Sequence, residues 1–265
     1  MMVRALAALM AALLLAIPAT AKPGFNWPAG KTSAIVLTYD DSLVSHLDIA
    51  APQLEAAGFR GTFFLNGTFP VALMPRWRAL AANGHELGNH TIFHPCPAGS
   101  FKMDPQFETE RYTIPGMIRE IGAMNTTLFA IDGQTQRTMS LPCSVSLAGG
   151  VDYTGALRAS GLIRYVRTGS NDGGFVSDPA QLDPFRVPSR SFPDTVTAEQ
   201  LIAYVKEVQA KGGMGVFMFH GVGGDYLVNS AAAHRGLLNY LKANPEIWVA
   251  PFQTVMDRAT GATLR

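Results

Sequence analysis

The sequence predicts an α/β fold built on a parallel sheet, either open or closed as a barrel. Short apolar runs alternate along the chain with segments whose apolar residues recur at helical spacing. The chain has 265 residues, of which 48% are hydrophobic and only 15% charged, so it can bury a sizeable core within one substantial domain. In such folds, polar residues at the carboxyl ends of the strands are the first candidates for a functional site.

The alternation begins near residue 34. Strands are expected at 34–39, 61–65 and 86–88, and helices at 44–57, 77–82 and 105–129, the last interrupted at Pro115. Further helices are expected at 153–160, 197–210 and 230–243 and from about residue 253, with strands at 162–167, 214–219 and 247–250. Thr197 and Gln200 have the spacing of a capping box. The stretch 169–194 is rich in Gly, Pro, Ser and Asp, which is typical of surface excursions that border functional sites.

The first 21 residues have the layout of a secretory signal peptide. Arg4 precedes an unbroken apolar run over 5–17, and Pro18 and a small-residue ending at Ala21 follow it. The alternatives are an uncleaved anchor and a buried helix, but the run is shorter than the roughly 20 apolar residues that span a bilayer. We therefore expect a domain over 22–265 that is periplasmic or secreted and has no membrane span.

Charge and cysteine content limit the partners. The formal net charge is +1 and no basic patch is evident, so neither a nucleic acid nor a strongly charged substrate is expected. Cys96 and Cys143 are the two cysteines. In an oxidising compartment they can form a disulfide, which we favour, and the alternative is two separately buried thiols.

Adjacent carboxylates follow the first strand, at Asp40 and Asp41. Successive side chains of a strand point to opposite faces, so both can reach one site only where the chain begins to turn. The alternative is that one Asp caps the next helix while the other is solvated.

Three of the six histidines lie within ten positions, at 85, 90 and 94. His90 and His94 are four residues apart, so one helical turn would place both imidazoles on the same side at metal-chelating separation. A zinc-protease motif starting at His85 is excluded because Asn89 stands where its second histidine is required. His220 follows the strand at 214–219, where it is either a functional group or a satisfied core residue.

Together these motifs resemble the polysaccharide deacetylase family, the NodB-homology group or carbohydrate esterase family 4, over nearly all of the chain after the signal. Thr-Tyr-Asp-Asp-Ser at 38–42 is similar to the first family motif, the His-Thr-Ile-Phe-His-Pro segment at 90–95 to the second, and Phe-His at 219–220 to the last. The resemblance implies a distorted (β/α) barrel. It also implies Asp40 as general base, Asp41, His90 and His94 as metal ligands, and His220 as general acid.

The middle motifs fit less well. The third is nearest to Ser-Leu-Pro-Cys-Ser at 140–144, which lacks the usual arginine, so Arg137 is the candidate to orient Asp40. By the same resemblance, the backbone N–H of Cys143 helps to hold an oxyanion, and Asp172 is the candidate to tune the acid histidine.

The function implied is metal-dependent hydrolysis of acetyl groups from an acetylated poly- or oligosaccharide, at either nitrogen or oxygen. Zinc suits the two-histidine, one-carboxylate set best, although cobalt or another first-row ion is compatible with it. Because the third motif is altered, the alternative is a catalytically impaired protein that only binds glycan or metal. Aromatic residues in loops, at Phe93, Phe175, Phe192 and Tyr226, either line a sugar groove or are packing residues.

Overall fold

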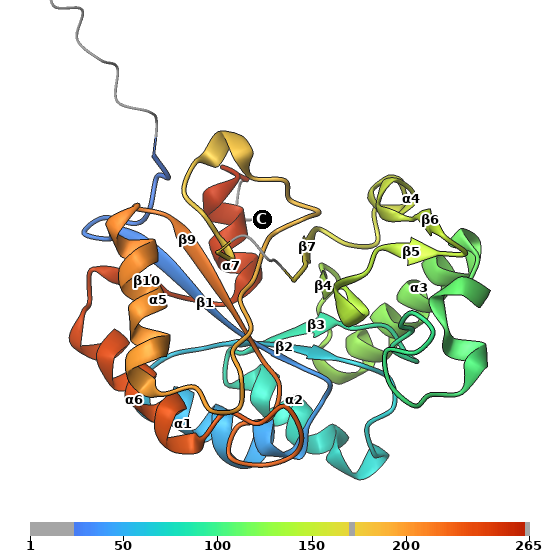
Figure 1. The fold of residues 1–265 in the computed structure, drawn as a ribbon, viewed down its shortest axis with the longest axis horizontal. Coiled ribbons are helices and arrows are strands. Elements are labelled where there is room, and N and C mark those ends of the chain that lie inside the picture. The colour runs from blue at the N-terminus through green and yellow to red at the C-terminus, as the bar shows by residue number, and fades with distance from the viewer. Residues whose placement is uncertain (1–23, 170–172, 263–265) are drawn as a thin grey trace, which may run out of the picture.

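The computed structural model describes residues 24–169 and 173–262 (Figure 1). The predicted signal peptide and Asp172 lie outside these ranges. No helix in the described ranges is long and apolar enough to cross a membrane.

An eight-stranded sheet forms the centre of the described part of the chain (Figure 1). Its order is β7-β4-β3-β2-β1-β9-β8, and β10 pairs with β1. The strands are β1 (Ser33–Asp40), β2 (Thr62–Leu65), β3 (Glu86–Asn89), β4 (Thr138–Ser140), β7 (Tyr165–Arg167), β8 (Phe175–Val176), β9 (Met214–Phe219) and β10 (Ile247–Val249). A separate antiparallel hairpin joins β5 (Leu147–Ala148) and β6 (Val151–Asp152). In the large sheet only β8 is antiparallel to its neighbour among the described strands.

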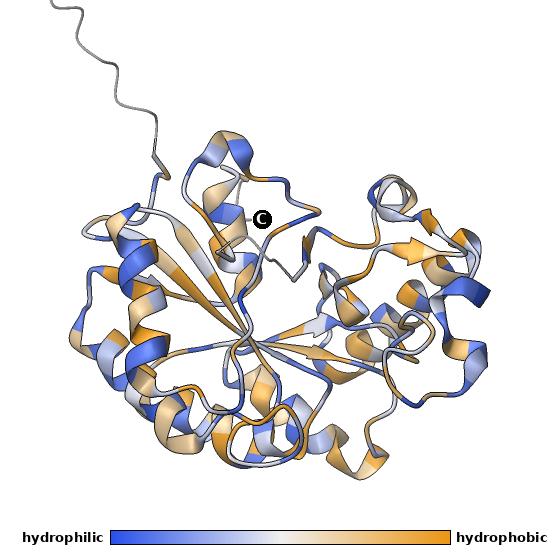
Figure 2. Cartoon of the chain, in the orientation of Figure 1, coloured by the Kyte–Doolittle hydropathy of each residue, from blue (hydrophilic) through white to orange (hydrophobic). Residues whose placement is uncertain are grey.

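Helices surround this sheet (Figure 1). They are α1 (Ala51–Ala57), α2 (Met74–Ala82), α3 (Ile114–Asp132), α4 (Thr154–Ser160), α5 (Ala198–Ala210), α6 (Ala231–Ala243) and α7 (Phe252–Ala259). A π-helical turn at His46–Ala50 leads into α1, and short 3-10 turns lie at Val71–Leu73, Pro105–Phe107, Thr109–Arg111, Pro142–Ser144 and Pro179–Gln181. Apolar colour gathers on the central strands, whereas the helices carry both apolar and polar residues (Figure 2).

Strand β1 is the axis of the fold, because all eight of its residues are buried. Its odd-numbered side chains, such as Leu37 and Tyr39, join a core that also holds residues of α1, α5 and α6. Ala34 and Val36 point the other way, into a core completed by α7. Burial on both faces explains why β1 reads as a continuous apolar run rather than an alternating one.

The sheet curls into a distorted barrel, which confirms the predicted fold class. Isolated bridges join Arg167 at the end of β7 to Val187, and Arg190 to Phe217 in β9. The irregular segment between residues 187 and 190 therefore lies between β7 and β9 and links these two strands of the curled sheet through single bridges.

Most predicted elements are confirmed, and the capping box at Thr197 and Gln200 is present at the start of α5. The helix expected over 105–129 is wrong in its first part. Thr113 caps α3, and Pro115 lies in its first turn, where the missing N–H of proline costs nothing. Pro115 therefore starts this helix and does not interrupt it. Strands β4, β5, β6 and β8 were missed because each is only two or three residues long.

A buried polar chain crosses the core between β1, α1 and α6. The Nε2 atom of His234 lies 2.7 Å from the hydroxyl of Tyr39, and its Nδ1 atom lies 2.7 Å from Oε1 of Gln53. Burial, with a smaller contribution from repulsion by His46, lowers the pKa of His234 to about 3. The neutral ring therefore receives the Tyr39 proton at Nε2 and donates its own to Gln53.

This pKa shift predicts a loss of stability in acid. The unfolded chain binds a proton at His234 near pH 6.5, and the folded chain binds it only near pH 3. The contribution of the buried neutral ring to the unfolding free energy is therefore complete above about pH 6.5 and is lost as the pH falls toward 3. Between about pH 7 and about pH 4.5, the wild-type chain should lose about 2–3 kcal/mol more unfolding free energy than His234→Gln. Urea denaturation at several pH values measures this difference, and equal pH dependence in the two proteins would contradict it.

Candidate active site and metal centre

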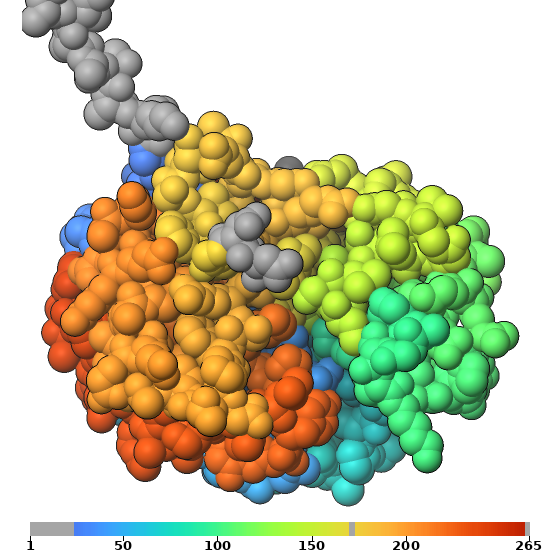
Figure 3. All heavy atoms as spheres, in the orientation of Figure 1, coloured from blue at the N-terminus to red at the C-terminus, as the bar shows by residue number. Residues whose placement is uncertain are grey.

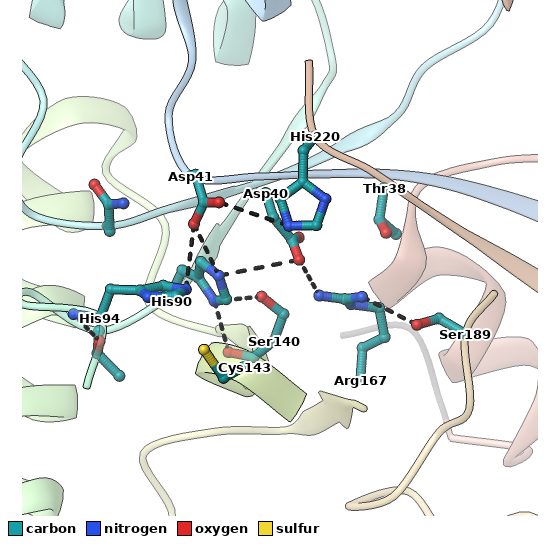
Figure 4. A network of polar contacts seen from close by, with 12 residues as sticks. Thr38, Asp40, Asp41, His90, His94, Ser140, Cys143, Arg167, Ser189 and His220 are labelled. Carbon is teal, nitrogen blue, oxygen red and sulfur yellow. Dashed lines mark hydrogen bonds and ion pairs between the residues drawn. The ribbon is translucent and has the colours of Figure 1, made fainter. Parts of the chain in front are cut away.

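The carboxyl ends of β1, β3, β7 and β9 carry the side chains that form the site. Asp40 is the last residue of β1, and Asp41 and Ser42 follow with φ values of 80° and 58°. This turn brings both carboxylates to one site, as Figure 4 shows. The side chains of Asp40 and Asp41 are only 2% and 6% exposed. The sequence prediction that the pair converges at a turn is therefore confirmed.

His90 and His94 converge on Asp41. The Nε2 atom of each histidine lies 3.3 Å from Oδ1 of Asp41 (Figure 4). One ligand atom from each of the three residues lies within 4.8 Å of the others.

The segment that carries the two histidines is a loop after β3, so the expected helical turn is wrong. Its backbone N–H groups donate to side chains, from Thr91 to Asn89 and from His94 to Thr91. Those of Ile92 and Phe93 both donate to Glu120. Thr91 and His94 have positive φ values of 61° and 53°. Local side-chain acceptors thus replace the helical hydrogen bonds, yet they bring the imidazoles together as predicted.

This arrangement fits a divalent metal ion. Ligand atoms bonded at about 2.0–2.1 Å in tetrahedral geometry stand about 3.3 Å apart. The two separations of 3.3 Å at Asp41 match that value. Oδ1 of Asp41 is also buried without a hydrogen-bond partner, and such an atom is costly unless something binds it. Ser140 fixes the better-buried histidine, because Nδ1 of His90 lies 2.9 Å from the Ser140 backbone oxygen and 2.6 Å from the Ser140 hydroxyl, which leaves Nε2 free for the ion.

Arg167, not Arg137, orients Asp40. Arg167 forms a buried ion pair with Oδ2 of Asp40, and its second terminal nitrogen donates to Ser189 at 3.0 Å (Figure 4). Arg137 instead pairs with Asp132 at the opposite ends of the strands. The prediction for Arg137 is wrong because Arg137 precedes β4, whereas Arg167 ends β7 beside the site. Arg167 closes the strand predicted at 162–167, so the rule that strand-end polar residues form sites would have found it.

His220 lies beside the carboxylate of Asp41. Its Nε2 atom is 3.6 Å from Oδ2 of Asp41, and its backbone oxygen lies 2.9 Å from Nε2 of His46. Asp172, the predicted partner of His220, lies outside the described residues.

Burial and mutual charge shift the pKa values of the three candidate ligands. Burial alone would raise the pKa of Asp41, but the close contact with His90 and the charges of all three neighbouring histidines hold it well below its usual value. Burial, with repulsion from His90, lowers the pKa of His94 to about 4. Burial opposes protonation of His90 as well, yet the two carboxylates raise its pKa. A cation is therefore favoured at the centre of this group.

A cavity of about 930 Å³ opens onto these residues. Phe93, Phe101, Tyr226 and Leu227 line it and are each about half exposed. In Figure 3 the face is hollowed between the orange segment near residue 225 and the green segments opposite it. Phe175 and Phe192, in contrast, pack against the core. A second cavity, of about 780 Å³, is lined by Asp132 and Arg137 and contains none of the clustered site residues.

The predicted disulfide is present between Cys96 and Cys143, whose Cα atoms lie 5.6 Å apart. It ties the loop of His94 to the turn after β4. Sγ of Cys96 lies 3.5 Å from Nδ1 of His94, so the bond lies directly behind a candidate metal ligand.

The family model described as polysaccharide deacetylase matches residues 28–148, which include both aspartates and both candidate ligand histidines. Over these residues the chain is similar to the polysaccharide deacetylase family. A stretch of 68 residues is also 37% identical to a gellan lyase of Bacillus sp, but this match covers 26% of the chain and 3% of the length of that protein.

Solved structures share the fold. A proposed polysaccharide deacetylase from Mycobacterium smegmatis superposes with a TM-score of 0.64 at 17% identity, over 92% of this chain and 96% of that one. A peptidoglycan deacetylase from Bacillus subtilis superposes with a TM-score of 0.56 at 16% identity, over 86% of this chain and 92% of that one. The carbohydrate esterase family 4 domain of a multidomain xylanase from the hindgut metagenome of Trinervitermes trinervoides also has a TM-score of 0.56 at 16% identity. The superposition covers 85% of this chain and 90% of that one.

The disulfide should contribute substantially to stability. It closes a loop with a sequence separation of 47 residues, for which the loss of chain entropy in the unfolded state amounts to about 4 kcal/mol. Replacing both cysteines, Cys96→Ser with Cys143→Ser, should lower the unfolding free energy by about 2–4 kcal/mol in denaturant titrations. Reductant should lower the unfolding free energy of the wild-type chain by the same amount as the double substitution does, and should leave that of the double variant unchanged. A wild-type chain insensitive to reductant would contradict this prediction.

Proposed function

We propose that this chain hydrolyses acetyl groups from a carbohydrate with the help of a divalent metal ion held by Asp41, His90 and His94. The observation that carries the proposal is the placement of Oδ1 of Asp41 at 3.3 Å from both imidazole nitrogens, with Asp40 and His220 close by. Zinc suits two histidines and one carboxylate best.

The residues around the proposed ion divide the chemistry between them. When bound, the ion supplies Lewis-acid activation of a carbonyl group and of water. Asp40, held by Arg167, takes the proton of the attacking water as general base. His220 donates a proton to the departing sugar nitrogen or oxygen, and the backbone N–H of Cys143 at the cavity wall helps to stabilise the oxyanion. Acetate and a free amine or hydroxyl are the products.

The cavity suits an uncharged, acetylated sugar. No Lys or Arg is found among the described residues that line it, so apart from the proposed ion an anionic group of a substrate would find no permanently charged partner there. Half-exposed aromatic rings at its rim offer flat apolar surfaces of the kind that pack against sugar rings. An N-acetyl amino sugar, as in chitin or peptidoglycan, and an O-acetyl group of a xylan-like glycan both meet these requirements.

The alternative is a protein that binds glycan or metal without turnover. One structure with the same fold, at a TM-score of 0.54 and 14% identity, is a mutant of a carbohydrate esterase family 4 pseudoenzyme with restored activity, so the fold alone does not guarantee catalysis. Here Arg167 supplies a cation to Asp40 from β7, which removes the reason for expecting impaired catalysis from the altered third motif.

We propose further that the chain acts outside the cytoplasm. The signal-like sequence over 1–21 supports export, and a disulfide beside a candidate metal ligand suits an oxidising compartment.

Acetate release by the chain over 22–265 tests the proposed function. Acetylated chitooligosaccharides, peptidoglycan fragments and acetylated xylan are each incubated with zinc, with cobalt and with a chelator. Metal-dependent release from at least one substrate is expected, and the substrate identifies the bond hydrolysed. No release from any of them by metal-loaded protein would favour the binding alternative.

Variants separate the base from the ligands. Asp40→Asn should retain metal and lower turnover by about 100-fold or more, because a general base commonly contributes 10²–10⁴-fold. His94→Ala removes one of three ligands and should lose most bound metal while the fold persists. Metal analysis beside the rate measurement checks both. Loss of metal in Asp40→Asn would reassign that residue as a ligand.

Arg167 and Arg137 form a matched pair of buried arginines with different tasks. Arg167→Lys keeps the charge but loses the planar guanidinium, so the misplaced base should lower kcat by about 10–100-fold with metal content unchanged. Arg137→Lys should lower thermal stability and leave kcat close to wild type, since its partner Asp132 lies far from the site. Equal effects of the two substitutions on kcat would contradict the assignment of Arg167.

A further inference from the structure

Tyr226 makes a contact that the proposed mechanism does not use. Its hydroxyl donates a hydrogen bond of 2.9 Å to Oδ2 of Asp41, the carboxylate oxygen that does not face His90 and His94. The two oxygens of Asp41 are therefore in different environments. Oδ1 is buried, has no hydrogen bond and lies between two imidazoles, whereas Oδ2 is bound by a phenol.

The loop after β9 is built to hold this side chain in place. Within it, the Gly221 N–H donates to the backbone oxygen of Tyr226 at 3.0 Å, and the Asn229 N–H donates to the backbone oxygen of Gly221 at 2.9 Å. Outside it, the Asp225 carboxylate accepts from the Ser45 N–H at 2.8 Å, and the Asn229 amide donates to the Pro193 oxygen at 3.0 Å.

The loop is closed tightly at Gly221. A Cβ atom at that position would lie 2.1 Å from the Gly224 oxygen and 2.7 Å from the Tyr226 oxygen, so only glycine fits. Tyr226 itself is 52% exposed at the cavity, so burial of its ring does not hold it there. The hydroxyl contact with Asp41 and the folded backbone of the loop hold the phenol beside the site.

We propose that Tyr226 is a positioning residue for the metal centre: its hydroxyl occupies Oδ2 of Asp41 and so presents Oδ1 alone to a divalent ion. This inference rests on the proposed metal site. A carboxylate can bind an ion through one oxygen or both, and a strong donor on one oxygen favours the single-oxygen mode. The same bond satisfies Oδ2 in a side chain that is only 6% exposed, which leaves the neighbouring His220 free to act on substrate.

Tyr226→Phe tests this role because it keeps the ring and removes only the donor. Zinc affinity, measured by competition with a chromogenic chelator, should fall about 10-fold, since partners of metal ligands commonly contribute 10–100-fold. The visible absorption spectrum of the cobalt-loaded protein should also change, because the carboxylate is then free to use both oxygens. A ring that only packs against sugar would alter neither quantity.

The control is Tyr240→Phe, the same chemical change at a tyrosine of α6 that does not line the cavity. It should leave zinc affinity and the cobalt spectrum unchanged, and circular dichroism should show that metal-free Tyr226→Phe still folds, although the loss of one hydrogen bond lowers its thermal midpoint. Wild-type affinity and spectrum in Tyr226→Phe would overturn the inference and leave the metal site intact. Failure of the wild-type chain to bind zinc or cobalt would overturn the inference and the proposed function together.

Discussion

Two carboxyl groups occupy adjacent positions at the end of β1, in a site that water hardly reaches, and their burial sets the requirements for everything around them. Negative charge placed there without a partner would cost several kcal/mol, so each carboxyl group needs its own compensation. Asp40 receives it from Arg167 and Asp41 from the histidines that converge on it. Because the two sources differ, chemically identical neighbours are prepared for different tasks, one as a proton acceptor and the other as a ligand.

The compensation comes from strand ends that are distant in sequence, which explains why the curled sheet matters for the site. Pairing of β1 with both β2 and β9 places the loops after β3 and β9 on either side of Asp41. The disulfide then fixes the His94 loop against the turn at Cys143. Few of these contacts depend on long flexible side chains, so the geometry is prepared before any ion or substrate arrives, as preorganised sites require.

Sequence reasoning identified most of the site because strand-end position and short-range spacing are local properties. Asp40, Asp41, His90, His94 and His220 all meet in the structure. The same reasoning failed for Arg137, whose nearness to the altered third motif suggested a contact that the fold does not make. It also assigned a helical turn to His90 and His94, because four-residue spacing does not distinguish a helix from a loop held by side-chain acceptors.

By itself the sequence determined the alternation of the longer strands and helices, the pair of cysteines able to bond, and the five side chains most suited to metal and proton chemistry, since these depend on periodicity and residue type. Only the tertiary structure decided which arginine reaches Asp40 and which oxygen of Asp41 Tyr226 occupies. Those contacts join residues 127 and 185 positions apart, and the pairing register of the curled sheet and the closure of one loop bring them together. No spacing along the chain encodes a distance of that kind.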